Sequence, residues 1–581
     1  MHGKSLVTLF FLATLSLLSA GLLSAAPAGA SKPAAIPIRP GTALAKLVNE
    51  ATPHIEALAI ANERVKVDVP NWLRAHYMRN HSQLLSAIRP EDPTGGFPLA
   101  LENLYVWMLH NQSLQPSPVP SSSPAGKVVS VGTNRRISGK QTAPRSESDI
   151  RTLFSDAKQI VAASNNIGNG RQAQFFSMDG GVTWGQTFLP LITGDSLHSD
   201  PTVDWTSDGT AWATTIGISA GSAVLQMRAY KSTDGGKSWT FDATFSGEQT
   251  STDKQMMCVD HAQTSRFRDN IYVIWHNNAP AFVGRRSATG WQAPIQVSGP
   301  ETTGTSIGSD ITTNSSGDVF VVWPDTGSQT LFIAKSVDGA ASFSKPTSIA
   351  KTFGSFQIRV PSFAGRAALI GASIASFRDT TRNDVYISWT DLSGGNNCNS
   401  PDSEPFDDTS SSCKSRIWVT RSVDGGVTWD QPQKVNDQTS LSDQFNQKLA
   451  VDPTTGVLGI SYYDTSADNG RKKTDLVFQA SVDKGEHWSP PVTTVTSAMT
   501  DETTGSADAG NQYGDYNGLS VVNGVFFPCW TDRRSNQSEE IFSARISVLK
   551  DAGGKAAVTF VDGTKSATPA KTSETRRRPG A

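Results

Sequence analysis

Seven short segments rich in β-branched and aromatic residues recur along the middle of the chain, and stretches rich in Gly, Ser and Asp separate them. The segments are residues 159–164, 210–215, 270–276, 318–323, 384–390, 456–463 and 524–530. Runs of this length and composition, bounded by turn residues, are typical of buried β-strands. Because other strand-like segments flank each run, the pattern predicts seven units of several antiparallel strands, with six or eight units as the alternatives.

The ends of the chain have different patterns. Apolar positions recur at helical spacing over residues 41–111, which predicts a small helical N-terminal region. Residues 112–126 are rich in Pro and Ser and cannot bury much apolar surface, so we expect a linker there. The strand-like units occupy residues 127–550, and residues 551–581 are predicted to be a flexible tail.

A short phrase repeats within the strand-like part: Ser, any residue, Asp, a pair containing Gly, and then an aromatic residue three positions later. The aspartates of this phrase are Asp179, Asp234, Asp338, Asp424 and Asp483. Asp followed by Gly favours a tight turn, because the carboxylate accepts local backbone N–H bonds and Gly tolerates positive φ. The shorter spacings between copies are roughly 40–60 residues, which is typical of β-propeller blades.

The phrase resembles the Asp-box of the BNR-repeat, sialidase-like β-propellers, and the resemblance covers residues 127–550. It implies an all-β fold, with the Asp-boxes on the face opposite the active site. If residues 127–131 supply the outer strand of the last blade, the two ends of the propeller pair and the ring has no open edge. The segments Gly514–Leu519 and Trp530–Arg534 also resemble exported bacterial BNR-repeat proteins of unassigned role.

The composition and the N-terminal segment indicate the compartment of the protein and the partners that it can bind. The net charge of −2 provides no general attraction to nucleic acid or to anionic membranes. Residues 1–30 combine Lys4, an apolar run and the small residues Ala28-Gly29-Ala30, a pattern typical of a secretory signal peptide. We therefore expect a secreted or periplasmic protein with no membrane span after signal cleavage, whose partner is a glycan or an extracellular protein.

The four cysteines fit an exported protein. Cys398 and Cys413 flank an insertion rich in Ser, Asp and Asn, and we predict a disulfide between them. Cys258 and Cys529 fall in strand-like segments, so we expect them to be buried free thiols. The sequence has no CxxC and no HExxH pattern, which argues against a zinc site.

Acidic residues recur where the chain enters or leaves the predicted inner strands, and these points line the central funnel in which propellers usually bind ligands. The candidate ligand-binding residues are Asp149, Asp253, Asp310, Asp443, Asp515, Asp532, Arg533, Trp275 and Trp389. The alternative explanation for the acids is capping of strand ends and solubility. As a binding site, an acid-lined funnel suits a metal ion such as Ca²⁺ or a hydroxyl-rich sugar flanked by tryptophans.

The resemblance also implies a possible sialidase site. Sialidases hold the substrate carboxylate with three arginines and use a Tyr nucleophile with an Asp acid. By position, Arg151, Asp200 and Tyr516 are the catalytic candidates, but Thr152 replaces the expected Pro and Asp443 stands where the sixth blade would need an arginine. Charges about 4 Å apart interact by roughly 4 kcal/mol at an effective dielectric of 20, so a funnel with more Asp than Arg repels an anionic sugar.

Three functions are consistent with these patterns. We favour a secreted, sialidase-like β-propeller that binds a glycan or a protein in its funnel. The first alternative is an exo-sialidase-type or other glycoside hydrolase, so the sequence leaves open whether the chain is an enzyme. The second is a non-catalytic scaffold that docks partners through the helical N-terminal region.

Overall fold

The computed structural model describes residues 134–139, 143–166, 170–219, 224–394, 398, 413–435, 441–488, 492–504, 507–508, 510–550 and 556–560. The regular elements in this part of the chain are all β-strands, and none of it forms a helix with the length and hydropathy of a bilayer span. The predicted signal peptide, helical region and linker, residues 1–30, 41–111 and 112–126, lie outside the described residues. Those three assignments stay predictions.

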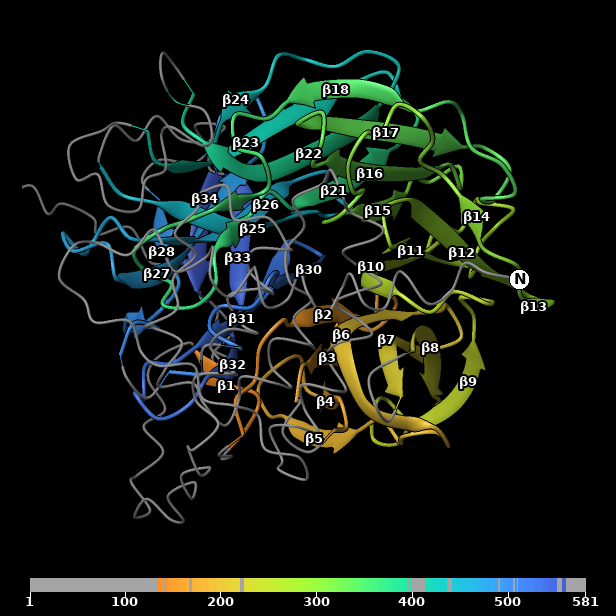
Figure 1. The fold of residues 1–581 in the computed structure, drawn as a ribbon, viewed down its shortest axis with the longest axis horizontal. Coiled ribbons are helices and arrows are strands. Elements are labelled where there is room, and N and C mark those ends of the chain that lie inside the picture. Colours follow the sequence, from red (N-terminus) through yellow and green to blue (C-terminus); the bar gives the residue numbers. More distant parts are fainter. Residues whose placement is uncertain are drawn as a thin grey trace, which may run out of the picture.

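Seven antiparallel sheets follow one another along the chain and are arranged as a ring (Figure 1). Blades 1 to 3 are β2(Asp149–Thr152) to β5(Gly185–Phe188) with β3(Ile160–Ser164) and β4(Ala173–Ser177); β6(Asp195–Trp205), β7(Ala211–Ser219), β8(Leu225–Ser232) and β9(Thr240–Thr244); and β10(Thr252–Val259), β11(Ile271–Asn277), β12(Ala281–Ser287), β13(Gly290–Trp291) and β14(Ile295–Gln296). Blades 4 to 6 are β15(Asp310–Thr313), β16(Val319–Asp325), β17(Thr330–Ser336) and β18(Thr347–Lys351); β21(Ala372–Arg378), β22(Asn383–Leu392), β23(Ser415–Ser422) and β24(Gln433–Lys434); and β25(Gln444–Val451), β26(Leu458–Asp464), β27(Lys473–Ser481), β28(Thr493–Thr494) and β29(Thr500–Asp501). Blade 7 contains β30(Gly518–Val522), β31(Val525–Asp532), β32(Glu540–Ser543) and β33(Ile546–Lys550). The protein is therefore a seven-bladed β-propeller, which confirms the predicted all-β fold and the favoured blade number.

The seven predicted segments overlap the second strands β3, β7, β11, β16, β22, β26 and β31. Every residue of β16 and of β26 is buried. Both faces of a blade pack against neighbouring blades, so these strands are buried along their whole length and lack the alternation of a one-sided sheet. The first strand of each blade lies nearest the centre of the ring in Figure 1, and its N-terminal end therefore opens at one end of the central channel.

Both ends of the propeller contribute outer strands to blade 7. β1(Arg135–Arg136) pairs with β32, with Arg135 opposite Ser543, so the N-terminal side of the propeller does close the ring. The predicted closing segment, residues 127–131, lies outside the described residues, and the observed closing strand begins after it. Part of the predicted flexible tail is instead a strand, because β34(Ala556–Phe560) pairs antiparallel with β33.

The repeated phrase forms the predicted turns. In blade 1, Oδ1 of Asp179 accepts the N–H groups of Val182 and Thr183 at 3.1 and 2.9 Å, and Oδ2 accepts the Thr183 hydroxyl at 2.6 Å. The Ser177 hydroxyl accepts the N–H of Gly181 at 2.8 Å, and Gly181 has a φ of 84°. The Ser177 hydroxyl also donates to Oδ1 of Asp179 at 2.8 Å, and this Ser–Asp bond recurs at Asp234, Asp338, Asp424 and Asp483. These five aspartates are thus structural turn residues between the third and fourth strands.

A small hairpin departs from the blade pattern between blades 4 and 5. It consists of β19(Gln357–Ile358) and β20(Ala368–Leu369), which form a separate two-stranded sheet. The Phe363 ring in its loop lies 5.0 Å from the ring of Phe445 and 4.9 Å from that of Tyr513. These contacts fix the hairpin against blade 6 and against the segment that leads into blade 7.

Candidate functional site

Residues at the N-terminal ends of the inner strands meet at one end of the channel. Glu147 precedes β2, whereas Asp200, Lys254 and Asn446 lie within β6, β10 and β25, and their φ values are 55°, 55°, 51° and 52°. A residue with positive φ interrupts the hydrogen-bond ladder between two strands and changes the direction of the side chains beside it. β6, β10 and β25 each contain such a bulge. We define the channel mouth as Glu147, Asp200, Asp253, Lys254, Gln255, His276, Arg366, Asp515 and Tyr516.

Arg366 closes one side of the channel mouth. It comes from the β19–β20 hairpin, is buried, and its guanidinium forms ion pairs with Asp515 and with Glu147, the latter at 3.3 Å. It also donates to the carbonyl of Gly510 at 2.8 Å, and its backbone N–H donates to Gln512 at 3.0 Å. The hairpin is therefore tied to blades 1 and 7 through one buried cation.

A glycine allows the segment before blade 7 to approach blade 1 closely. Gly514 has a φ of 71°, and a Cβ there would lie 2.7 Å from the backbone nitrogen of Glu147. The N–H of Asp515 then donates to the Glu147 carboxylate at 3.2 Å. The close approach places the Asp515 side chain between Arg366 and Lys254, both of which contact it.

Charges at the channel mouth do not balance. The carboxylates of Glu147, Asp200, Asp253 and Asp515 face the cations Lys254 and Arg366, and all six residues contribute to one electrostatic cluster. Burial, and then the neighbouring Asp253, raise the pKa of Asp200 to about 6. The channel mouth thus contains four carboxylates and two cations, and a ligand-binding role for its acids stays a prediction.

Three acceptor atoms in the channel mouth are buried and have no hydrogen-bond donor within reach. They are Oδ2 of Asp200, Oε1 of Gln255 and Nε2 of His276. The amide nitrogen of Gln255 donates to the carbonyl oxygen of Asp200, so these two residues are in contact. His276 Nδ1 lies 2.8 Å from the carbonyl oxygen of Asn278, which can only accept, so Nδ1 carries the proton. Nε2 then presents a lone pair 3.8 Å from Oδ2 of Asp253.

The structure brings two of the three sialidase candidates together. Tyr516 lies near Asp200 in the channel mouth and donates its hydroxyl to the carbonyl of Pro201 at 3.1 Å. Burial, and then the charge of Asp200, raise the pKa of Tyr516 well above its usual value, which favours the neutral phenol. Arg151 lies further along β2 and pairs with Asp149 at 2.7 Å, an arrangement unlike a carboxylate clamp at Tyr516.

Two of the predicted ligand-binding acids link neighbouring inner strands. Oδ2 of Asp149 accepts the N–H of Val203 in blade 2 at 3.0 Å. Asp310 accepts the N–H of Ile374 in blade 5 at 3.1 Å and the Lys448 ammonium at 2.7 Å. These contacts correspond to the capping alternative, and a ligand role for both acids stays a prediction.

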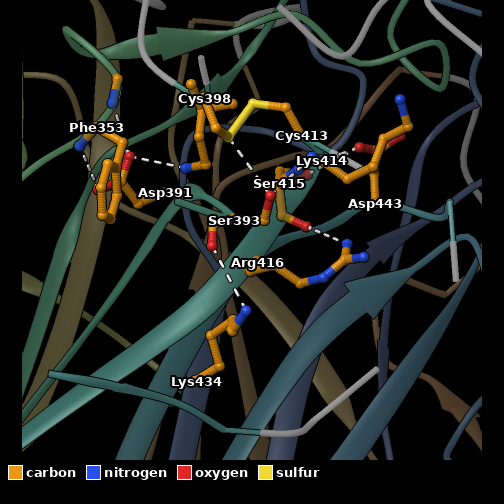
Figure 2. The surroundings of a disulfide bond; sticks show 12 residues. Phe353, Asp391, Ser393, Cys398, Cys413, Lys414, Ser415, Arg416, Lys434 and Asp443 are labelled. Atoms are coloured by element: carbon orange, nitrogen blue, oxygen red, sulfur yellow. Dashed lines mark hydrogen bonds between the residues drawn. A yellow bond between two sulfur atoms is a disulfide. The ribbon is translucent and has the colours of Figure 1, made fainter. Parts of the chain in front are cut away.

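Asp443 lies beside the disulfide-closed loop rather than in the channel mouth. Cys398 and Cys413 form the predicted disulfide, and Ser415, just beyond it, donates its N–H to Asp443 at 3.2 Å (Figure 2). Arg471 also pairs with Asp443 at 2.8 Å. The other two cysteines are free as expected: Cys529 is buried, whereas Cys258 is only half-buried.

Asp532 and Arg533 are engaged within blade 7. Asp532 accepts the indole N–H of Trp530 at 2.9 Å and pairs with Arg534. Arg533 is buried and donates to the carbonyl of Asp501 at 2.7 Å. The position of both side chains fits packing of the loop after β31.

The two tryptophans predicted to flank a ligand lie elsewhere. Trp275 and Trp389 are 0% and 1% exposed and belong to the apolar core between blades. The Trp275 ring packs against Phe245, with ring centroids 5.6 Å apart. The prediction that they line the channel is therefore wrong. Both lie on second strands, and a second strand presents its two faces to the neighbouring blades and neither face to the channel.

Arg366, Glu147, Gln255 and His276 were missed by sequence reasoning. The sequence gives only a weak indication of Arg366. Residues 352–371 do not fit the blade pattern, which indicates an insertion but does not show where that insertion packs. Glu147 lies two positions before the first strand of the first blade and, like Asp200 in β6, has a positive φ. Gln255 and His276 carry no pattern that would distinguish them from ordinary strand residues.

One group of described residues has the spacing of a metal site, and it lies away from the channel mouth. Asp483, Glu486 and His487 offer ligand atoms within 4.8 Å of one another in the turn of blade 6. His487 Nδ1 lies 2.7 Å from Asp483 at the position where other blades carry a Thr or Ser hydroxyl, so a structural role accounts for it. A groove of about 290 Å³ lined by Tyr386, Arg421 and His487 adjoins this turn.

Comparison with known proteins gives similarity of fold only. No protein-family model and no curated protein matches the chain. Similar solved structures include a protein of unknown function from Dyadobacter fermentans, with 13% identity, a TM-score of 0.40 and coverage of 72% of this chain and 98% of that one. Others are the GH93 α-L-arabinofuranosidase of Fusarium graminearum, with 12% identity, a TM-score of 0.40 and coverage of 71% and 97%, and the NanB sialidase of Streptococcus pneumoniae, with 11% identity, a TM-score of 0.39 and coverage of 58% and 68%.

Proposed function

We propose that the chain is an exported glycan-binding β-propeller whose ligand occupies the channel mouth. The observation that carries the proposal is the set of buried acceptors without donors, on Asp200, Gln255 and His276. A buried polar group without a partner costs about 1–3 kcal/mol, so a ligand that supplies O–H or N–H donors is stabilised there. Sugar hydroxyls are such donors.

The electrostatics of the channel mouth select against sialosides. A sialic acid carries a carboxylate, which needs cationic donors, whereas Lys254 and Arg366 are already paired with Asp515. Excess acid at the channel mouth repels an anionic sugar by Coulomb's law. We therefore assign neutral or cationic glycans as the ligand class.

The Cys398–Cys413 disulfide supports the exported setting. Disulfides persist in oxidising compartments such as the periplasm and the extracellular space and are rare in the cytosol. Export also gives the protein access to glycans of the cell surface and surroundings.

A panel of immobilised neutral, amino and sialylated oligosaccharides tests the proposal. We expect the full-length protein to bind neutral or amino glycans, and Asp200→Asn to weaken binding by at least about tenfold, or roughly 1.4 kcal/mol. Asp156→Asn, at the opposite end of blade 1, is the matched control and should bind like the wild type. If the protein binds only the sialylated oligosaccharides, or binds no oligosaccharide on the panel, the proposal is contradicted.

Glycoside hydrolysis is the second candidate, and the raised pKa of Asp200 favours it. A carboxyl group with a pKa of about 6 is half protonated at pH 6, a range that suits general-acid catalysis in mildly acidic solution. In this reading Asp200 protonates the glycosidic oxygen, and the neighbouring Asp253 is the candidate base. Release of reducing ends from neutral oligosaccharides, lost in Asp200→Asn, would support hydrolysis; binding without turnover at high protein concentration would exclude it.

A further inference from the structure

The turn of blade 6 differs from the other four turns that carry the repeated phrase. Each of those four has a Thr or Ser four positions after the aspartate, and its hydroxyl donates to Oδ2 of that aspartate at 2.6 Å. Blade 6 has His487 at this position and Glu486 before it, where the others have Val, Lys or Ala. The imidazole keeps the turn closed as a hydroxyl does, but closure alone requires neither an imidazole nor a second carboxylate.

These two differences place three metal-ligating groups together. Asp483, Glu486 and His487 each offer one ligand atom, and the three atoms lie within 4.8 Å of one another. Zinc binds His nitrogen and carboxylate oxygen at about 2.0–2.2 Å, which separates its tetrahedral ligands by roughly 3.4 Å. The side chains of His487 and Glu486 are 85% and 54% exposed, so small rotations bring the ligand atoms to that spacing.

Neighbouring groups orient both carboxylates. The Ser481 hydroxyl donates to Oδ1 of Asp483 at 2.7 Å, and the His487 backbone N–H donates to the same oxygen at 3.0 Å. Oδ2 of Asp483 then lies 2.7 Å from Nδ1 of the imidazole. Arg421 of blade 5 donates to Oε1 of Glu486 at 3.3 Å. Hydrogen bonds of this kind hold metal-binding carboxylates in position.

A groove between blades 5 and 6 leads to these ligands. Its volume is about 290 Å³, and the residues that line it include Tyr386, Arg421, Glu486 and His487. Three protein ligands leave a fourth tetrahedral position, which water or a donor atom of another molecule fills. The groove therefore provides a path of entry for an ion and room for that fourth ligand.

We propose that Asp483, Glu486 and His487 bind a divalent transition-metal ion, of which Zn²⁺ suits them best. An imidazole nitrogen with two carboxylates favours Zn²⁺ over Ca²⁺ and Mg²⁺, because these harder ions prefer oxygen ligands alone. The spacing of the three residues matches neither CxxC nor HExxH, so motif reasoning did not identify them. Strands alternate in direction within a blade, so the turn after the third strand lies at the end opposite the channel mouth. The site is thus independent of the proposed glycan binding.

Titration calorimetry of the full-length protein with ZnCl₂ tests the inference, and CaCl₂ is the comparison. We expect Zn²⁺ to bind at least about tenfold more tightly than Ca²⁺. His487→Thr and Glu486→Val each restore the residue of the blade 5 turn and remove one ligand, so each should weaken Zn²⁺ binding by at least about tenfold. Lys484→Gly is the matched control. It restores the Gly of the other turns at a φ of 66° and keeps all three ligands, so it should bind Zn²⁺ like the wild type.

The three variants decide whether the ion binds in the turn of blade 6. If the wild type binds no Zn²⁺, or if both ligand variants bind it like the wild type, the inference is overturned. Equal weakening in Lys484→Gly also overturns it, because the shape of the turn then matters and the ligands do not. Ca²⁺ affinity equal to that for Zn²⁺ overturns the choice of ion. Both ligand variants rebuild a turn that already folds in blade 5, and thermal unfolding verifies that each protein is folded.

Discussion

Lys254 of blade 3 forms an ion pair with Asp515, which precedes the first strand of blade 7, although 261 positions separate them in the sequence. Their side chains are 5% and 3% exposed, so the pair is shielded from water. Arg366 contacts the same carboxylate from the hairpin between blades 4 and 5. One acid thus joins three parts of the ring that are remote in sequence.

Removing the Lys254 ammonium should destabilise the propeller. We expect Lys254→Met to lower the free energy of unfolding by about 3 kcal/mol, because loss of one partner leaves a buried charge less well compensated. Urea denaturation followed by tryptophan fluorescence measures the change. The matched control is Lys231→Met, whose pair with Asp242 is 40% exposed on the lysine side and should matter by less than about 1 kcal/mol. Equal effects of the two variants would contradict the role given to the Lys254–Asp515 pair.

The turn aspartates should contribute stability that disappears in acid. Burial raises the pKa of Asp424, but hydrogen bonds from Thr428, Ser422 and Val427 outweigh that effect and lower the pKa to about 2. A depressed folded-state pKa means that its contribution is present above the unfolded pKa near 4 and is lost as the pH falls towards 2. Asp424→Asn should therefore cost about 1 kcal/mol at neutral pH, and the difference from wild type should shrink between pH 4 and pH 2. Thermal unfolding at a series of pH values measures it; a constant difference argues against the ionised turn.

The buried carboxyl pair Glu502 and Glu539 should have the opposite pH dependence. Both residues are 0% exposed, and burial raises the pKa of Glu502 to about 8. Because the folded protein retains a proton that the unfolded chain loses above about pH 4.5, stability should fall as the pH rises from 4.5 to 8. Glu502→Gln mimics the protonated form and should be more stable than wild type at pH 8 but similar at pH 4.5. An advantage that does not grow with pH would contradict this assignment.

The Cys398–Cys413 disulfide should stabilise blade 5 and its contact with blade 6. It closes a loop with a sequence separation of 15, and closure of such a loop is worth about 3 kcal/mol. A Cys398→Ser, Cys413→Ser double variant should unfold at a lower temperature than wild type, and a reductant should lower the wild-type midpoint without affecting the variant. If a reductant destabilises both proteins equally, the bond is not the source of the effect.

The sequence by itself determined the elements that depend on near neighbours. Asp179 and its four counterparts make their hydrogen bonds within four positions along the chain, so the repeated turns, and with them the blades, could be predicted. The second strands were found because both of their faces are buried, and the disulfide because its cysteines flank a single loop. Asp200 and Tyr516, selected as sialidase-type candidates, lie near each other in the structure, and a catalytic role for them stays a prediction.

Only the tertiary structure decided the character of the channel mouth. Arg366 reaches Glu147 across 219 positions, and no local pattern specifies which acids a hairpin cation will meet. Alternation along a strand separates two faces but cannot tell which one a ring of blades buries, so Trp275 and Trp389 were assigned to the channel although they pack between blades. Ring closure sets these long-range contacts, and they determine which acids are paired and which acceptors stay open to a ligand.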